Sequence, residues 1–216
     1  LLISAPRSGS GKTTVTLGLL AALRRRGMAM RAAKAGPDFI DPAFHTAATG
    51  HDSVNLDSWA MPPDLLDALM AGASSDADML VVEGAMGLFD GVEGNRGRTG
   101  ASADLAARYR LPVLLVLDVA AQAQSAAAVV RGFMSHDPEV RIGGVILNKV
   151  GTQRHRRLVS DAIAALGIPV VGAIPRNTKL ALPERHLGLV QAGEHGDLAN
   201  RLAGLADMAE AHCDLD

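Results

Sequence analysis

LLISAPRSGSGKTT, residues 1–14, decides the fold of this chain, because an apolar run leads into a glycine-rich turn and then into a helical pattern. The N–H groups of such a turn and the positive end of the following helix hold phosphate oxygens. We expect Lys12 to reach the β and γ phosphates of ATP and Thr13 to ligate Mg²⁺. The other candidate contacts to the phosphates are Ser8, Gly9, Ser10, Gly11 and Thr14.

Pro6 departs from the general pattern G-x-x-x-x-G-K-[ST], which places a glycine at that position. Proline has a fixed φ and no N–H group to offer a phosphate. Gly9 and Ser10 must therefore form this part of the turn. The alternative is a glycine-rich connection between a strand and a helix, in which Lys12 is incidental.

Composition limits the classes of protein to which the chain can belong. Its 216 residues are 48% hydrophobic, enough for one substantial core, so we expect a single domain over 1–216. The net charge of −2 gives no basic field, which argues against nucleic acid as a partner. There is one cysteine, no signal-peptide pattern and no apolar run near the ~20 residues of a membrane span. We therefore expect a cytoplasmic protein without a membrane partner.

Short apolar runs alternate with helical patterns along the chain. Each run is continuously apolar, which is typical of strands buried on both faces of a parallel sheet. The predicted strands are 1–5, 29–35, 79–83, 113–118, 142–147 and 170–174. The predicted helices are 12–26, 63–71, 102–108, 123–134 and 154–166. Together they predict an α/β fold with a doubly wound, mainly parallel sheet and helices on both faces.

Polar residues stand at the carboxyl ends of predicted strands, where open α/β sheets bind ligands. Glu83 ends one strand and precedes a glycine loop, so we expect its carboxylate to complete the Mg²⁺ shell opposite Thr13. Asn148 has an amide that can pair with the edge of adenine, and Pro175 can cover the purine face. The alternative is that each is an ordinary strand-end residue.

The segment 36–62 is long for a connection, so we expect it to carry function. It follows Lys34, a second candidate phosphate clamp, and it contains Asp38 and Asp41. These carboxylates can supply a further Mg²⁺ ligand or orient a substrate. Two turn-forming aspartates beside prolines are the alternative.

Loop arginines and aromatics give weaker signals. Arg96 and Arg98 lie in the glycine-rich loop 91–100 and can close over an anion, although a solvated loop is the more common explanation. Aromatic residues make up only 3% of the chain. Four of them fall in predicted loops, where they can line an apolar wall or simply pack: Phe39, Phe44, Trp59 and Phe89.

Taken together, these motifs resemble the cobyrinic acid a,c-diamide synthase family over the whole chain. The segments that carry the resemblance are APRSGSGKTT (5–14), KAGPDFIDPAFH (34–45), NLDSW (55–59), VVEGAMGLFDG (81–91), GVILNKV (144–150) and LPERHLGL (182–189). The resemblance implies a dethiobiotin synthetase-like P-loop NTPase fold, in which Thr13, Asp38 and Glu83 hold Mg²⁺ with the ATP phosphates. Pro6 is acceptable within that family.

The same resemblance implies a reaction. Such enzymes use ATP to phosphorylate the acetate carboxylates of a corrin ring, and ammonia then attacks the acyl phosphate to give the c amide and then the a amide in cobalamin biosynthesis. By the resemblance Phe39, Ile40, Asp41 and Asp90 lie near the substrate carboxylates. The cobalt-containing and metal-free substrates both stay open, with hydrogenobyrinic acid preferred, and the fold's relatives imply a homodimer.

A glutaminase domain, which supplies ammonia from glutamine in this family, is not found in the chain. Cys213 is the one cysteine, and it lacks the strand, glycine elbow and later histidine that such a nucleophile requires. We therefore expect the synthetase part alone, with ammonia normally delivered by the missing carboxy-terminal domain.

Competing families share parts of this pattern. Partitioning or positioning ATPases of the deviant-loop type have a signature lysine where this chain has Arg7, and they lack the DFIDP segment. They act on DNA or membranes, for which the sequence shows neither a basic surface nor an amphipathic membrane helix. Cobyric acid synthase, nickel sirohydrochlorin diamide synthase and dethiobiotin synthetase are nearer alternatives of the same fold.

Overall fold

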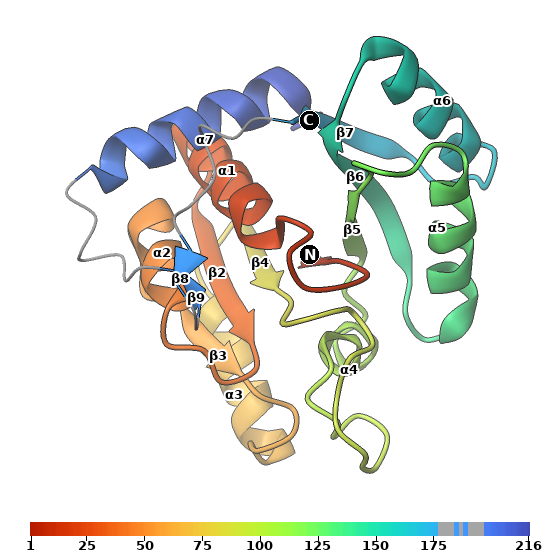
Figure 1. Cartoon of the computed structure of the whole chain (residues 1–216). Helices are drawn as coiled ribbons and strands as arrows, with labels where there is room; N and C mark the ends of the chain where they lie inside the picture. The colour runs from red at the N-terminus through yellow and green to blue at the C-terminus, as the bar shows by residue number, and fades with distance from the viewer. Residues whose placement is uncertain (177–183, 186–187, 190–196) are drawn as a thin grey trace.

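Seven parallel strands form the central sheet of the computed structural model, which describes residues 1–176, 184–185, 188–189 and 197–216 (Figure 1). In sheet order the strands are β3 (Val54–Leu56), β2 (Met30–Ala35), β4 (Met79–Glu83), β1 (Leu2–Ser4), β5 (Val113–Asp118), β6 (Ile142–Val150) and β7 (Val170–Pro175). A separate antiparallel pair consists of β8 (Glu184–Arg185) and β9 (Gly188–Leu189). Part of the motif at 182–189 lies outside the described residues.

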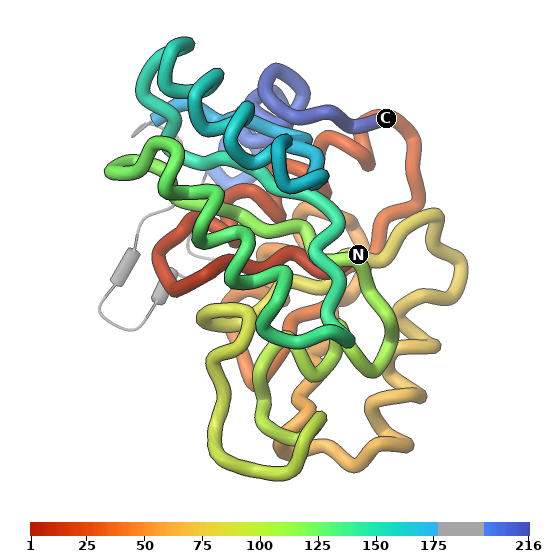
Figure 2. Tube along the Cα trace, turned by 90° about the vertical axis from the view of Figure 1, so that its right-hand side faces the viewer, coloured from red at the N-terminus to blue at the C-terminus, as the bar shows by residue number. Residues whose placement is uncertain are grey.

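Helices cover both faces of the sheet and enclose two apolar cores. The first core contains residues of α1 (Lys12–Arg25), α2 (Asp41–Thr49) and α7 (Leu198–His212). The second contains residues of α3 (Pro63–Ser74), α4 (Ser102–Arg108), α5 (Ser125–His136) and α6 (Gln153–Ala164). α5 and α6 pack against each other on this second face, which Figure 2 turns toward the viewer. The predicted doubly wound α/β fold is confirmed.

The inner strands are apolar over most of their length because both faces of the sheet are covered. In β5, Val113, Leu115 and Leu117 belong to one core, whereas Leu114 and Val116 belong to the other. Successive side chains of a strand point to opposite faces, so most positions of a strand buried on both sides are apolar. This explains the continuous apolar runs of the sequence.

Three elements differ from the sequence-based expectation. The segment 36–62 contains α2 and β3, neither of which the sequence pattern predicts, and α7 is not among the predicted helices. β3 is only three residues long, and α2 begins at Asp41-Pro42, a pair that suits a turn as well as a first helical turn. β6 continues to Val150, so Asn148 lies within the strand and not after it.

β1 lies at the point of the sheet where the strand order reverses. Its neighbours are β4 on one side and β5 on the other, and the chain leaves its carboxyl end into the phosphate loop and α1. Open α/β sheets bind ligands at such a point, outside the carboxyl ends of the strands. Among the helices of the described residues, none is long and apolar enough to cross a membrane.

α7 completes the first core by packing along α1. Gly18 permits the close approach, since a Cβ atom there would lie 2.8 Å from the carbonyl oxygen of Leu205. Near the end of α1, Arg25 forms ion pairs with Asp207 and Glu210. The arginines in the last turn of α1 therefore have a structural role, as their position at the carboxyl end of a helix indicates.

We expect Gly18→Ala to destabilise the protein by about 1–3 kcal/mol, because the added methyl group meets backbone of α7. Gly132→Ala in α5 is the matched control, since a Cβ atom there meets nothing within 4 Å and a helical glycine costs about 0.5–1 kcal/mol relative to alanine. Urea unfolding of both variants measures the difference. Equal stabilisation by both substitutions would contradict the packing described for α1 and α7.

Candidate nucleotide and metal site

The phosphate loop joins β1 to α1 in a shape that its glycines allow. Gly9 and Gly11 have φ values of +72° and +93°, which residues with side chains rarely adopt. Ser10 is buried, and its hydroxyl donates to the carbonyl oxygen of Arg7 at 2.9 Å. α1 begins at Lys12, and the first N–H groups of a helix have no partner within it. The other predicted phosphate contacts lie in this loop or in the first turn of α1: Ser8, Thr13 and Thr14.

Asn148 supports this loop from β6. Its side-chain amide donates to the carbonyl oxygen of Ser10 at 2.8 Å, and its amide oxygen accepts from the N–H of Lys149 at 2.9 Å. A Cβ atom on Gly11 would lie 2.2 Å from the amide nitrogen, so only glycine fits there. Both ends of the amide bond to backbone, so Asn148 supports the phosphate loop, and adenine recognition by its remaining hydrogen-bonding capacity stays a prediction.

A second contact ties the loop to the end of β5. Asp118 accepts from the ammonium group of Lys149 at 2.8 Å and lies 3.5 Å from the guanidinium of Arg7. Burial works against the Asp118 carboxylate, but Lys149 outweighs it and lowers the pKa of Asp118. Lys149 has a φ of +61°, a strained value for a residue with a side chain. Pro175 ends β7 and is exposed.

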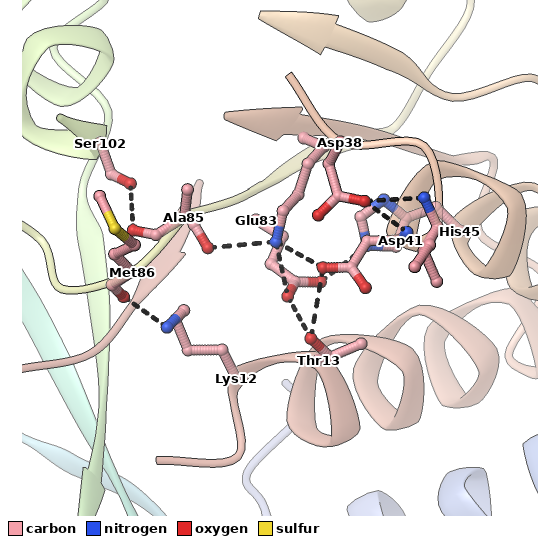
Figure 3. A network of polar contacts seen from close by, with 12 residues as sticks. Lys12, Thr13, Asp38, Asp41, His45, Glu83, Ala85, Met86 and Ser102 are labelled. Atoms are coloured by element: carbon pink, nitrogen blue, oxygen red, sulfur yellow. Dashed lines mark hydrogen bonds and ion pairs between the residues drawn. The ribbon is translucent and has the colours of Figure 1, made fainter. Parts of the chain in front are cut away.

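Glu83 is the buried centre of the site (Figure 3). Its Oε1 accepts from the hydroxyl of Thr13 at 2.6 Å and from the ammonium of Lys34 at 3.1 Å. Its Oε2 lies 2.7 Å from Nε2 of His45. Burial alone would raise the pKa of Glu83, but Lys34 and His45 outweigh burial and hold the pKa well below its usual range. The carboxylate is therefore ionised at neutral pH.

Lys34 is shared between two carboxylates. Its ammonium group lies 2.6 Å from Asp41 and 3.1 Å from Glu83, and it also donates to the carbonyl oxygen of Gly84 at 3.3 Å. Burial disfavours the ammonium ion, yet the two carboxylates raise the pKa of Lys34 above its usual value. Burial and the charge of Glu83 raise the pKa of Asp41, which makes Asp41 the first of the two acids to take up a proton.

The donor set at this point fits Mg²⁺. Mg²⁺ is usually held by one or two carboxylates together with phosphate oxygens and water. The site offers one hydroxyl and two carboxylates, from Thr13, Asp41 and Glu83, and the Thr13 hydroxyl lies 3.5 Å from Asp41. The positive charge between the two acids in this structure is the ammonium group of Lys34. Within the described ranges no cluster of three or more His, Cys, Asp or Glu residues suits a metal held by protein alone.

Asp38, the third residue of the predicted Mg²⁺ set, lies just before α2. Its Oδ1 accepts from the N–H groups of Ile40 at 2.7 Å and Asp41 at 3.0 Å, which holds the start of α2. Asp41, one helical turn further along, is the residue that contacts Thr13 and Lys34. The structure therefore brings Asp41 into the predicted set with Thr13 and Glu83 and leaves Asp38 at its edge (Figure 3).

The loop after β4 covers the other side of the phosphate loop. The ammonium of Lys12 donates to the carbonyl oxygen of Met86, which has a φ of +42°. Asp90 is exposed, and its carboxylate accepts from the N–H of Gly87 at 2.8 Å, which closes the turn. Burial and the charge of Lys34 lower the pKa of Lys12 to about 8. Phosphate oxygens would favour the charged form of Lys12.

The four loop aromatics separate into two groups. Phe44 is fully buried in the first core, and Phe89 contacts Phe133 with 5.4 Å between ring centroids. Phe39 and Trp59 are 93% and 58% exposed. Only the second group is free to meet a ligand.

Neither loop arginine is free in this structure. Arg96 forms ion pairs with Asp137 and Glu139, both at 2.9 Å. Arg98 donates to the carbonyl oxygens of Trp59 and Met61, which fastens the loop 91–100 to the segment after β3. An anion would have to compete with these contacts.

The sequence patterns do not predict the contacts of two polar residues, His45 and Asp104. His45 is fully buried against Glu83, although the histidines show no metal-ligand spacing. Asp104 in α4 accepts from the hydroxyl of Ser58 and from the N–H of Thr99, both at 2.7 Å. The one sequence signal that includes His45 is its place at the end of the segment KAGPDFIDPAFH.

Comparisons with known proteins agree with this geometry. Residues 1–190 match the family described as the CobQ/CobB/MinD/ParA nucleotide binding domain. The whole chain is 63% identical to a hydrogenobyrinate a,c-diamide synthase of Mesorhizobium japonicum and 54% identical to one of Agrobacterium fabrum, covering 49% of each. The chain thus spans about half the length of these curated relatives.

A solved structure with the same fold is chloroplast FtsY from Physcomitrella patens. The TM-score is 0.53 at 21% identity, and the match covers 82% of this chain and 58% of FtsY. At this identity the likeness shows the fold alone. The resemblance inferred from the sequence motifs is confirmed by the synthase relatives.

We expect Asn148→Ala to weaken the binding of ADP and GDP alike by about tenfold, because the phosphate loop loses a hydrogen bond and its support. Titration with each nucleotide measures the effect. Asn200→Ala is the matched control, since, among the residues that the structure describes, that amide bonds to exposed Asp197. A loss confined to adenine nucleotides would instead establish base recognition by Asn148.

We expect Lys34→Met to destabilise the protein by about 3–5 kcal/mol, because Asp41 and Glu83 lose the cation that they share in a buried site. Lys149→Met removes a partly exposed ion pair and should cost less than about 1 kcal/mol. Urea unfolding at neutral pH compares the two. Similar stabilities would show that the buried pairing contributes no more than a surface pair.

Proposed function

We propose that this chain, which belongs to the CobQ/CobB/MinD/ParA nucleotide binding domain family, is the ATP-using part of a hydrogenobyrinate a,c-diamide synthase. The observation that carries the proposal is the 63% identity to such an enzyme over all 216 residues. The site supports it chemically, because a phosphate loop, a lysine and two carboxylates converge as phosphoryl transfer requires.

The proposed reaction has two steps. An oxygen of a substrate acetate group attacks the γ phosphorus of ATP, the bond from that phosphorus to the bridging oxygen breaks, and ADP leaves. Ammonia then attacks the acyl carbon, and the amide forms as inorganic phosphate and a proton leave. The protein contributes chiefly by binding the triphosphate, neutralising its charge and aligning the carboxylate with the γ phosphorus.

Residues of the buried site have separate roles in this proposal. Lys12 and the phosphate loop hold the β and γ phosphates, and Thr13, Asp41 and Glu83 are the residues that would hold Mg²⁺. When bound, Mg²⁺ neutralises charge on the phosphate oxygens. Asp38 stays a candidate for the metal shell or the substrate, because its Oδ2 accepts no hydrogen bond within the described part of the chain.

The substrate side of the site is apolar and exposed. Phe39 is 93% exposed, Trp59 58% and Met86 52%, values that are unusual for large apolar side chains. A corrin ring is broad, flat and apolar at its centre, with carboxylates at its rim. We propose that Phe39 and Ile40 contact the ring and that Asp90 and Lys34 act near the carboxylate under attack.

We further propose that ammonia comes from a glutaminase domain outside this chain, that two copies form a homodimer, and that the enzyme works in the cytoplasm. The half-length match to the relatives is compatible with a further domain in those proteins.

No observation favours the alternative of a partitioning-type ATPase. The position of the signature lysine in that class holds Arg7 in this chain. The guanidinium of Arg7 lies 3.5 Å from Asp118.

Mass spectrometry tests the proposed function directly. We expect amidated product when the protein is incubated with hydrogenobyrinic acid, Mg-ATP and ammonium, and ADP should form only in the presence of the ring. Cobyrinic acid, tested in parallel, determines whether cobalt is tolerated. The same amide should be lost in Asp38→Asn and Glu83→Gln, because each removes a carboxylate charge next to the nucleotide.

Asp67→Asn is the matched control for these variants, because Asp67 pairs with Arg108 on the exposed surface. It should retain the wild-type rate. ADP release that does not depend on either ring, with no amide formed, would refute the amidation hypothesis for this chain and favour the ATPase alternative.

A further inference from the structure

His45 is a fully buried histidine next to Glu83 to which the proposed reaction gives no role. It lies in α2, four residues after Asp41, and residues four apart share one face of a helix. One face of α2 therefore delivers both an acid and a histidine to the same buried cluster (Figure 3). His45 contacts Glu83 through Nε2 at 2.7 Å and Ser53 through Nδ1 at 3.3 Å.

The charge state of Glu83 determines which ring nitrogen of His45 carries a proton. An ionised carboxylate only accepts hydrogen bonds, so the Nε2 atom that faces Oε2 must carry the hydrogen. In the neutral ring Nδ1 is then left as an acceptor for the Ser53 hydroxyl. With a neutral ring, Ser53, His45 and Glu83 form a chain of hydrogen bonds with one direction, from the residue before β3 to the carboxyl end of β4.

The two oxygens of Glu83 are divided between two sets of partners. Oε1 faces Thr13 and Lys34, the side on which the phosphate loop lies, whereas Oε2 faces His45. A carboxylate bonded through only one oxygen can rotate about its last carbon–carbon bond. The hydrogen bond to Oε2 opposes that rotation and keeps Oε1 directed at Thr13.

We propose that His45 is a positioning residue, whose Nε2–H fixes the Glu83 carboxylate so that Oε1 is presented to the Mg²⁺ ion of the nucleotide. The inference rests on the nucleotide and Mg²⁺ part of the proposed function and not on the identity of the amidated substrate. Partners behind a metal ligand typically change metal affinity by 10–100-fold when they are removed.

The experiment measures nucleotide affinity with and without Mg²⁺. Calorimetric titration with ADP in EDTA and in excess Mg²⁺ gives two dissociation constants for each variant. The Mg²⁺ ratio is the dissociation constant in EDTA divided by the one in excess Mg²⁺. We expect His45→Asn to reduce this ratio by about 10–100-fold while the affinity in EDTA stays within about twofold of wild type. The asparagine amide reaches only as far as Nδ1, so it can meet Ser53 but not Glu83.

His45→Gln is the conservative variant that separates positioning from mere packing. The glutamine amide nitrogen stands as many bonds from the backbone as Nε2, so it can donate to Glu83, and it should retain most of the Mg²⁺ ratio. His155→Asn is the matched control: that histidine also bonds through both nitrogens, to Gly151 and Gln122, but lies away from Glu83. It should leave the ratio unchanged, and melting curves should show all three variants folded.

The outcomes distinguish this inference from the proposed function. An unchanged Mg²⁺ ratio in His45→Asn, or an equal loss in His45→Asn and His45→Gln, would overturn the positioning role. If His45→Asn does not fold, the Mg²⁺ ratios of His45→Gln and Ser53→Ala decide. A lost ratio in His45→Gln together with a wild-type ratio in Ser53→Ala would then also overturn the positioning role. A Mg²⁺ effect that follows the expected order, in a protein that amidates neither ring, would leave His45 as a positioning residue and refute the amidation.

Discussion

The rest of the site depends on the ion pairs that the buried ammonium group of Lys34 forms with Asp41 and Glu83. The ammonium group lies 2.6 Å from Asp41 and 3.1 Å from Glu83, and all three side chains are almost completely buried. Buried charges are tolerated when they are paired and hydrogen-bonded, and they are costly otherwise. Because these residues belong to β2, α2 and β4, their pairing determines how the chain folds back after β2. This pairing joins α2 to β2 and β4, in addition to the apolar contacts of α2 in the first core.

The phosphate loop is held from two sides by different chemistry. On the β4 side, the hydroxyl of Thr13 bonds to Glu83, so the first turn of α1 is attached to the charged cluster. On the β6 side, the amide of Asn148 bonds to the carbonyl oxygen of Ser10, and Asp118 gathers Lys149 and Arg7. The first support joins the loop to the buried charged cluster, whereas the second includes the neutral amide of Asn148.

Sequence reasoning succeeds where a local pattern determines the structure and fails where a distant contact does. β4, β5 and α4 have the predicted bounds because continuous apolar or helical patterns end there at polar residues. The resemblance implies Asp38 as a Mg²⁺ ligand, but both aspartates fit the local pattern, and it is the start of α2 that brings Asp41 to Thr13. The roles of His45 and Asn148 depend on partners 38 and 138 residues away, and no spacing rule reveals such partners.

The two sides of the site differ in how complete they are within this chain. On the nucleotide side Lys34 and Glu83 are buried and paired with each other. On the side proposed for the substrate, Phe39 is 93% exposed and Trp59 58%. An acyl phosphate is consumed by water unless water is excluded from it. Under the proposed function, exclusion on this side must therefore come from the substrate ring itself, stacked on these aromatics, or from protein beyond this chain.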